Sequence, residues 1–146
     1  MLRNFGQAIR PWLQTKSYIP SADLGTTEDD IRFMLTANGL KVPLRSLTYE
    51  LSGLYTGITV FAAAIRAAQH IGLDLSQASV AIEGFGNVAT SAAQAFWKNG
   101  IRVVAISTTQ GAIYNESGLD VGELVSIRDR VGSQVVNEFD RGERID

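Results

Sequence analysis

The apolar residues of this chain follow two patterns, one with the spacing of helices and one typical of short buried strands. Apolar side chains three or four positions apart share one face of a helix and can bury it. Pro11 weakens the last turn of the first such segment. The predicted helices cover residues 2–13, a segment from a cap at Thr26 or Thr27 to Asn38, residues 58–71, residues 87–98, and about ten residues after a cap at Asp120.

Two uninterrupted apolar runs predict buried strands at 79–83 and 102–107. The valine pair 135–136 is a candidate for the start of a further short strand, and a turn is predicted at 114–118. Mixed signals between 40 and 57 indicate a connection. Because strands alternate with helices, the pattern predicts an α/β protein with a parallel sheet.

A glycine-rich turn, Gly84-Phe85-Gly86-Asn87-Val88-Ala89, separates the first predicted strand from the helix that follows it. In a G-x-G-x-x-A turn, the first glycine allows a sharp bend and the second lets a pyrophosphate approach the backbone. Free N–H groups at the helix start would face the phosphates. The turn therefore predicts a dinucleotide site at Gly84, Phe85, Gly86, Asn87 and Val88. The alternative is a tight turn in an ordinary α/β domain.

The end of the second predicted strand bears on the choice of coenzyme. An acidic residue usually stands there and holds the ribose hydroxyls of NAD, whereas a nearby arginine accommodates the 2′-phosphate of NADP. The local sequence has neither, and Ser107 and Thr108 occupy the place. The sequence therefore predicts NAD or NADP without choosing between them.

Composition excludes several classes of function. Thirteen basic and fifteen acidic residues are scattered along the chain, which is not the clustered charge of a nucleic-acid-binding protein. No apolar stretch approaches the roughly 20 residues of a membrane span, and the start of the chain has no secretory apolar region. Without cysteine, and with His70 as the single histidine, neither a metal site nor a catalytic triad is expected. A cytoplasmic location is expected. The charges of residues 128–130 and 140–144 alternate in sign, which is typical of solvent-exposed surface.

Several segments resemble the coenzyme domain of the glutamate/leucine/phenylalanine/valine dehydrogenase family. They are residues 18–26, which are similar to the family's Pro-x-x-Asp-x-Gly-Thr segment, and residues 80–88, 103–107, 111–120 and 142–145. The resemblance implies a single partial NAD(P)-binding domain: a Rossmann-like, doubly wound parallel sheet in 58–146, preceded by a helical arm and connection in 1–57. It also implies oxidative deamination of an L-amino acid, with glutamate as the expected substrate, to a 2-oxo acid.

Two residues take roles from this resemblance. Asp23 would be the general acid/base that moves protons during deamination, and Thr56, in a Thr-Gly step, would lie near the nicotinamide end of the coenzyme. Each residue also has a plainer interpretation. An aspartate often stabilises a turn, and a threonine often caps a helix that begins just after it.

The sequence also departs from the family pattern. Ile58-Thr59 replaces an Arg-Gly step, and Thr108 replaces the acid after the second strand. The glycine- and lysine-rich substrate domain, which precedes this region in the family, has no counterpart in the sequence. We therefore expect amino-acid binding through that missing domain, a homo-oligomer, and no activity of this chain alone. The alternative is a non-catalytic nucleotide-binding or assembly module derived from the family.

Overall fold

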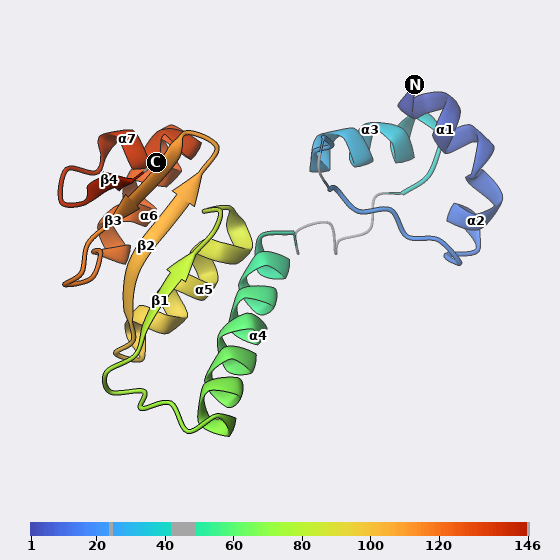
Figure 1. The fold of residues 1–146 in the computed structure, drawn as a ribbon. Coiled ribbons are helices and arrows are strands. Elements are labelled where there is room, and N and C mark those ends of the chain that lie inside the picture. The colour runs from blue at the N-terminus through green and yellow to red at the C-terminus, as the bar shows by residue number, and fades with distance from the viewer. Residues whose placement is uncertain (24, 42–48, 146) are drawn as a thin grey trace. The chain divides into compact units, whose positions relative to one another are not determined.

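The computed structural model describes residues 1–23, 25–41 and 49–145 of the chain. The chain forms two compact units, Met1–Leu51 and Ser52–Asp146, which are labelled by element in Figure 1. Each unit has its own cluster of buried apolar side chains. Each therefore buries apolar surface independently of the other.

Up to residue 41, the described residues of the N-terminal unit contain three helices: α1 (Leu2–Ala8), α2 (Arg10–Gln14) and α3 (Glu28–Ala37). The prediction of one helix over 2–13 is wrong, because the backbone leaves the helical conformation at Ile9, with φ −94° and ψ 6°. Pro11 lies in the first turn of α2, where its missing N–H leaves no helical hydrogen bond unmade. The core of this unit consists of Leu13, Ala22, Ile31, Met34 and Leu35.

Helix α3 begins as the sequence predicts, at a cap formed by Thr27. The Asp30 N–H donates to Thr27 Oγ1 at 3.2 Å, and the Thr27 N–H donates to Asp30 Oδ2 at 2.8 Å. This reciprocal pair is a capping box, which satisfies free N–H groups at the helix start. The hydrogen bonds from Thr27 also hold the pKa of the Asp30 carboxyl below its usual range.

The C-terminal unit is built on a four-stranded sheet with the order β1-β2-β3-β4. Strand β1 (Ser79–Ile82) runs parallel to β2 (Arg102–Thr108), with Ile82 beside Ile106. Strand β3 (Gly111–Tyr114) is antiparallel to β2, and β4 (Glu143–Ile145) is antiparallel to β3. The α/β class is confirmed. The predicted parallel pairing holds for β1 and β2, whereas β3 and β4 are antiparallel, so the sheet is mixed.

The mixed sheet follows from the short connection between β2 and β3. Thr108 pairs with Gly111, so a two-residue hairpin joins these strands, whereas parallel neighbours need a crossover of a dozen or more residues. Gly111 has φ +121°, a conformation that favours glycine. The predicted turn follows β3, and the Gly118 N–H donates to the Asn115 carbonyl at 2.9 Å.

Four α-helices and one short 3-10 helix pack with this sheet: α4 (Tyr49–His70, whose first three residues belong to the N-terminal unit), α5 (Asn87–Lys98), α6 (Val121–Val131), η2 (Gly132–Gln134) and α7 (Val135–Glu138). The prediction for α5 is confirmed, and so is the Asp120 cap of α6, whose carboxylate accepts from the Glu123 N–H at 3.0 Å. The expected strand at 135–136 is wrong. Both valines are buried, and neighbouring residues of a strand would point to opposite faces.

Helix α4 begins at Tyr49, well before the predicted start at residue 58. Residues 49–57 of the predicted connection are therefore helical, and residues 42–48 lie outside the described residues. Gly53 and Gly57 are buried where α4 meets α5: a Cβ on Gly57 would lie 2.7 Å from the Ala92 nitrogen. These glycines permit close helix packing where the sequence suggested an irregular segment.

The core of the C-terminal unit lies between the sheet and the helices that cover it. Helix α5 adds an edge-to-face contact between Phe96 and Phe61 of α4, with ring centroids 5.1 Å apart. The largest fully buried side chains of this unit come from two strands and two helices: Val103, Ile106, Ile113, Val121, Leu124, Val135 and Val136. This core fixes the carboxyl ends of β1 and β2 beside the start of α5.

Candidate coenzyme-binding site

The turn between β1 and α5 has the geometry that its glycines predict. Gly84 has φ +80°, which an L-residue with a side chain rarely adopts. Gly86 is the N-cap of α5, so the helix starts without a side-chain cap. A Cβ built on Gly86 meets no heavy atom within 4 Å. The first N–H groups of α5 are therefore left to an outside acceptor, beside open space.

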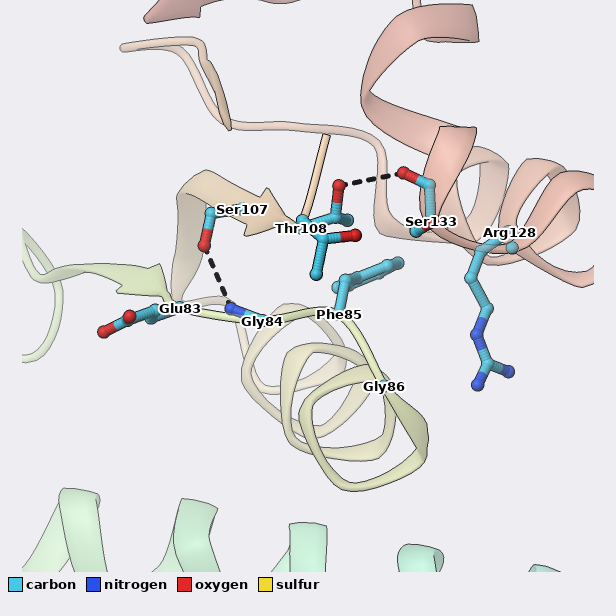
Figure 2. Close-up of a pocket in the computed structure, with 10 residues that line it drawn as sticks. Glu83, Gly84, Phe85, Gly86, Ser107, Thr108, Arg128 and Ser133 are labelled. Carbon is cyan, nitrogen blue, oxygen red and sulfur yellow. Dashed lines mark hydrogen bonds between the residues drawn. The ribbon is translucent and has the colours of Figure 1, made fainter. Parts of the chain in front are cut away.

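Hydroxyl groups at the end of β2 bind the turn and a neighbouring segment. Ser107 Oγ accepts a hydrogen bond from the Gly84 N–H at 3.0 Å, which joins the ends of the two parallel strands. Thr108 Oγ1 donates to the Ser133 carbonyl at 2.8 Å and accepts from the Gln110 N–H at 3.0 Å. Figure 2 shows the Ser107–Gly84 and Thr108–Ser133 hydrogen bonds beside one pocket.

A pocket of about 490 Å³ opens at this edge of the sheet (Figure 2). It brings together five residues that the sequence predicts to bind coenzyme, because the carboxyl ends of parallel strands meet at one edge. Phe85, which is buried, is one of the residues that line the pocket. The lining residues are Glu83, Gly84, Phe85, Gly86, Ser107, Thr108, Thr109, Arg128, Gly132 and Ser133.

Arg128 is one of five lining residues that the sequence did not predict; the others are Glu83, Thr109, Gly132 and Ser133. The prediction that residues 128–130 are all solvated surface is wrong for this side chain, which is 25% exposed and lines the pocket. Its guanidinium donates to Asn87 Oδ1, in the first turn of α5, and to Asp129 Oδ1 at 3.1 Å. One signal was available: Arg128 lies four residues after Leu124, which is fully buried, on the same face of α6.

The other three residues predicted to bind coenzyme, Asn87, Val88 and Thr56, do not line this pocket. Asn87 and Val88 form the first turn of α5 without lining the pocket, and Val88 is 39% exposed. Thr56 lies inside α4 and is exposed, so its interpretation as a helix cap is wrong. Its role near the nicotinamide stays a prediction.

Asp23 belongs to the N-terminal unit, where its backbone forms a turn. The Asp23 N–H donates to Thr26 Oγ1 at 2.9 Å, and the Asp23 carbonyl accepts from the Thr26 N–H at 2.8 Å. Gly25 takes φ +81° within this turn. The Asp23 side chain is exposed. Its role as general acid/base stays a prediction.

Two other features are absent from the parts of the chain that the structure describes. No group of three or more acidic or histidine side chains is placed to hold a metal ion there. Within the same residues, no helix combines the length and apolar character needed to cross a membrane.

Comparison with known proteins gives consistent relatives. The sequence model of the glutamate/leucine/phenylalanine/valine dehydrogenase family matches residues 52–146. The chain is 32% identical over 155 residues to a glutamate dehydrogenase of Thermotoga maritima, covering 98% of the chain and 37% of that protein. It is 28% identical over 145 residues to NADP-specific glutamate dehydrogenase A1 of Halobacterium salinarum, covering 90% and 34%.

A solved structure is similar as well. The hetero-hexameric glutamate dehydrogenase of Thermus thermophilus, in its leucine-bound form, superposes with a TM-score of 0.71 at 25% identity. The match covers 96% of this chain and 36% of the Thermus chain. The chain thus spans little more than a third of the length of these relatives. It belongs to the glutamate/leucine/phenylalanine/valine dehydrogenase family.

Proposed function

We propose that the C-terminal unit binds NAD or NADP and serves the oxidative deamination of an L-amino acid. The observation that carries this proposal is the start of α5. A glycine with open space around its Cα stands at an uncapped helix N-terminus, beside the ends of two parallel strands. That arrangement suits a pyrophosphate, because the backbone N–H groups and the helix dipole both favour negative charge.

The lining residues fit the adenosine diphosphate half of a dinucleotide. Gly86 and the backbone of Asn87 and Val88 would hold the pyrophosphate, since a side chain at Gly86 would fill the open space there. Ser107 and Thr108 stand at the end of β2, where the ribose hydroxyls of such coenzymes bind. Arg128 brings the positive charge that the sequence near β2 lacks. We propose on this basis that β1 and β2 belong to a doubly wound sheet.

The proposed chemistry divides between coenzyme and protein. When bound, the nicotinamide exchanges a hydride with the amino acid. Asp23 would exchange protons with the substrate, since forming and hydrolysing an iminium needs a group that both donates and accepts them. Thr56 would lie near the nicotinamide end. The 146-residue chain alone would bind coenzyme without turnover, because precise placement of a substrate needs more of the protein than this third of its relatives' length.

The relatives suggest the substrate and the assembly. Both curated relatives are named glutamate dehydrogenases, and one is NADP-specific. We therefore propose glutamate as the amino acid. The relative from Thermus thermophilus is a hetero-hexamer. We propose that this chain also works within an oligomer, for which a homo-oligomer is the simplest arrangement.

The test is a titration of the chain with NADH and NADPH, followed by nicotinamide fluorescence. Gly86→Val should abolish binding of both, because its side chain would fill the space for the pyrophosphate. The variant should keep its fold, since Gly86 has extended backbone angles and no close neighbours. Gly122→Ala, in α6, is the matched control and should bind as the wild type does. Unchanged affinity in Gly86→Val would place the phosphate site elsewhere.

A further inference from the structure

The pocket at the ends of β1 and β2 has little charge in its lining. Among the described residues that line it, Arg128 of α6 is the single cation and Glu83, which follows β1, is the single carboxylate. Figure 2 shows them on opposite sides of the glycine turn, with Arg128 on the side of Gly86 and Glu83 on the side of Gly84. An anion bound at Gly86 would therefore have the cation beside it and the carboxylate farther away.

The guanidinium of Arg128 is held at the first turn of α5. Its Nη2 donates to Oδ1 of Asn87, the residue that directly follows the N-cap Gly86. The Arg128 side chain is 25% exposed, so its charge is partly shielded from water. This contact places a positive charge beside the free N–H groups with which α5 begins.

The guanidinium has more donors than its protein partners use. It carries five N–H groups in one rigid plane. One of them donates to Asn87, and another donates to Asp129 Oδ1 at 3.1 Å. The Asp129 side chain is 61% exposed, and an ion pair so exposed is weak. Other N–H groups of the plane can therefore donate to phosphate oxygens while Nη2 keeps its bond to Asn87.

We propose that Arg128 binds the pyrophosphate of the dinucleotide together with the backbone N–H groups of α5, and that the Asn87 side chain positions it for this contact. The inference rests on the proposed coenzyme-binding function and extends it to a residue of α6. An arginine donates charge-assisted hydrogen bonds to phosphate oxygens, often two in parallel. Because NAD and NADP share the pyrophosphate, Arg128 strengthens the binding of both to the same degree.

A purely structural role for the same contact makes a different prediction. Arg128 joins α6 to α5, so its loss could loosen the wall of the pocket. A loosened wall would weaken the binding of adenosine, which has no phosphate, as much as that of ADP. Loss of a phosphate contact would instead weaken ADP and spare adenosine. Comparison of these two ligands therefore separates the two roles.

The experiment measures dissociation constants for four ligands with the wild type and with Arg128→Gln. Adenosine and ADP are titrated by NMR, and NADH and NADPH by nicotinamide fluorescence. The variant keeps an amide donor and removes the charge. We expect ADP, NADH and NADPH each to lose about ten- to thirtyfold in affinity, and adenosine to change by less than about twofold. The ratio of the NADH and NADPH affinities should stay as in the wild type.

Two further variants test the origin of the effect. Arg130→Gln removes the other basic residue in the last turn of α6, which pairs with Glu138 at 2.9 Å and is not part of the pocket lining. It should bind all four ligands as the wild type does. Arg128→Lys keeps the charge without the planar set of donors, so its affinity for ADP should lie between those of the wild type and Arg128→Gln.

Four outcomes would overturn the proposal. They are unchanged ADP affinity in Arg128→Gln, an equal loss for adenosine and ADP, a larger loss for NADPH than for NADH, and an equal loss in Arg130→Gln. Failure of the wild type to bind ADP, NADH and NADPH would instead refute the coenzyme-binding function itself.

Discussion

Helices α3 and α5 begin in opposite ways. At α3, Thr27 and Asp30 satisfy the free N–H groups of the first turn with their own side chains. At α5, the N-cap is Gly86, which has no side chain with which to accept from these groups. The free groups of a helix start must find acceptors somewhere. A helix whose own side chains accept from its first N–H groups leaves none of them for a ligand. A helix that begins at an exposed glycine leaves them available to bind an anion.

The largest expected effect comes from giving α5 a cap of its own. Gly86→Asp would place a carboxylate on the free N–H groups, which should stabilise the free protein by only about a few tenths of a kcal/mol, because glycine is itself a tolerable N-cap. The same carboxylate would occupy the phosphate position and repel a diphosphate. We expect dinucleotide affinity to fall at least a hundredfold, about 2.7 kcal/mol, in a fluorescence titration.

Gly86→Asn separates the two causes, because it has the same shape without the charge. It should weaken binding less than Gly86→Asp does. If Gly86→Asp kept wild-type affinity, then α5 would not be the anion site and the contrast with α3 would carry no functional meaning.

The next effect comes from removing the cap of α3. Thr27→Val deletes the hydroxyl that accepts from the Asp30 N–H and should cost about 1 kcal/mol in the stability of the N-terminal unit. Faster hydrogen exchange at the first amides of α3 would report this loss. Thr27→Ser keeps the hydroxyl and should restore protection, while α5 should exchange as in the wild type under either change.

The smallest effect is electrostatic. Hydrogen bonds from Thr27 lower the pKa of Asp30. A carboxyl with a lower pKa in the folded state stabilises the fold above its unfolded pKa, and this contribution is lost as the pH falls through the lowered value. Thr27→Val should therefore raise the Asp30 pKa toward its ordinary value in a carbon-detected NMR titration. An unchanged titration would mean that the Thr27 hydroxyl does not cause the shift, since the backbone N–H of residue 27 remains in the variant.

Local features of both helix starts could be predicted from the sequence. The glycine turn at 84–86 and the Thr27 cap depend on residues within a few positions of each other, and the structure has them where the sequence places them. Arg128 could not be placed in this way. It meets Asn87 across 41 positions of sequence, and only the packing of α6 against α5 brings them together.

Two errors in the predicted fold have the same origin. The valines at 135–136 have a strong preference for strands, but burial of both side chains in the core requires a helical turn. The glycines at 53 and 57 suggest an irregular segment, yet they lie inside α4 because α5 passes close to them. In both cases, tertiary contacts override a local preference that the sequence alone displays.

The packing at Gly57 has a consequence for mutational tolerance. An added Cβ would lie 2.5 Å from Ser91 Cβ and 2.7 Å from the Val88 carbonyl oxygen, and the backbone of α5 cannot move aside cheaply. In a library of random variants selected only for folding, position 57 should retain glycine while position 86 accepts many residues. Selection for coenzyme binding should then restrict position 86 as well. Selection for folding would thus retain glycine at position 57, and selection for coenzyme binding would retain it at position 86.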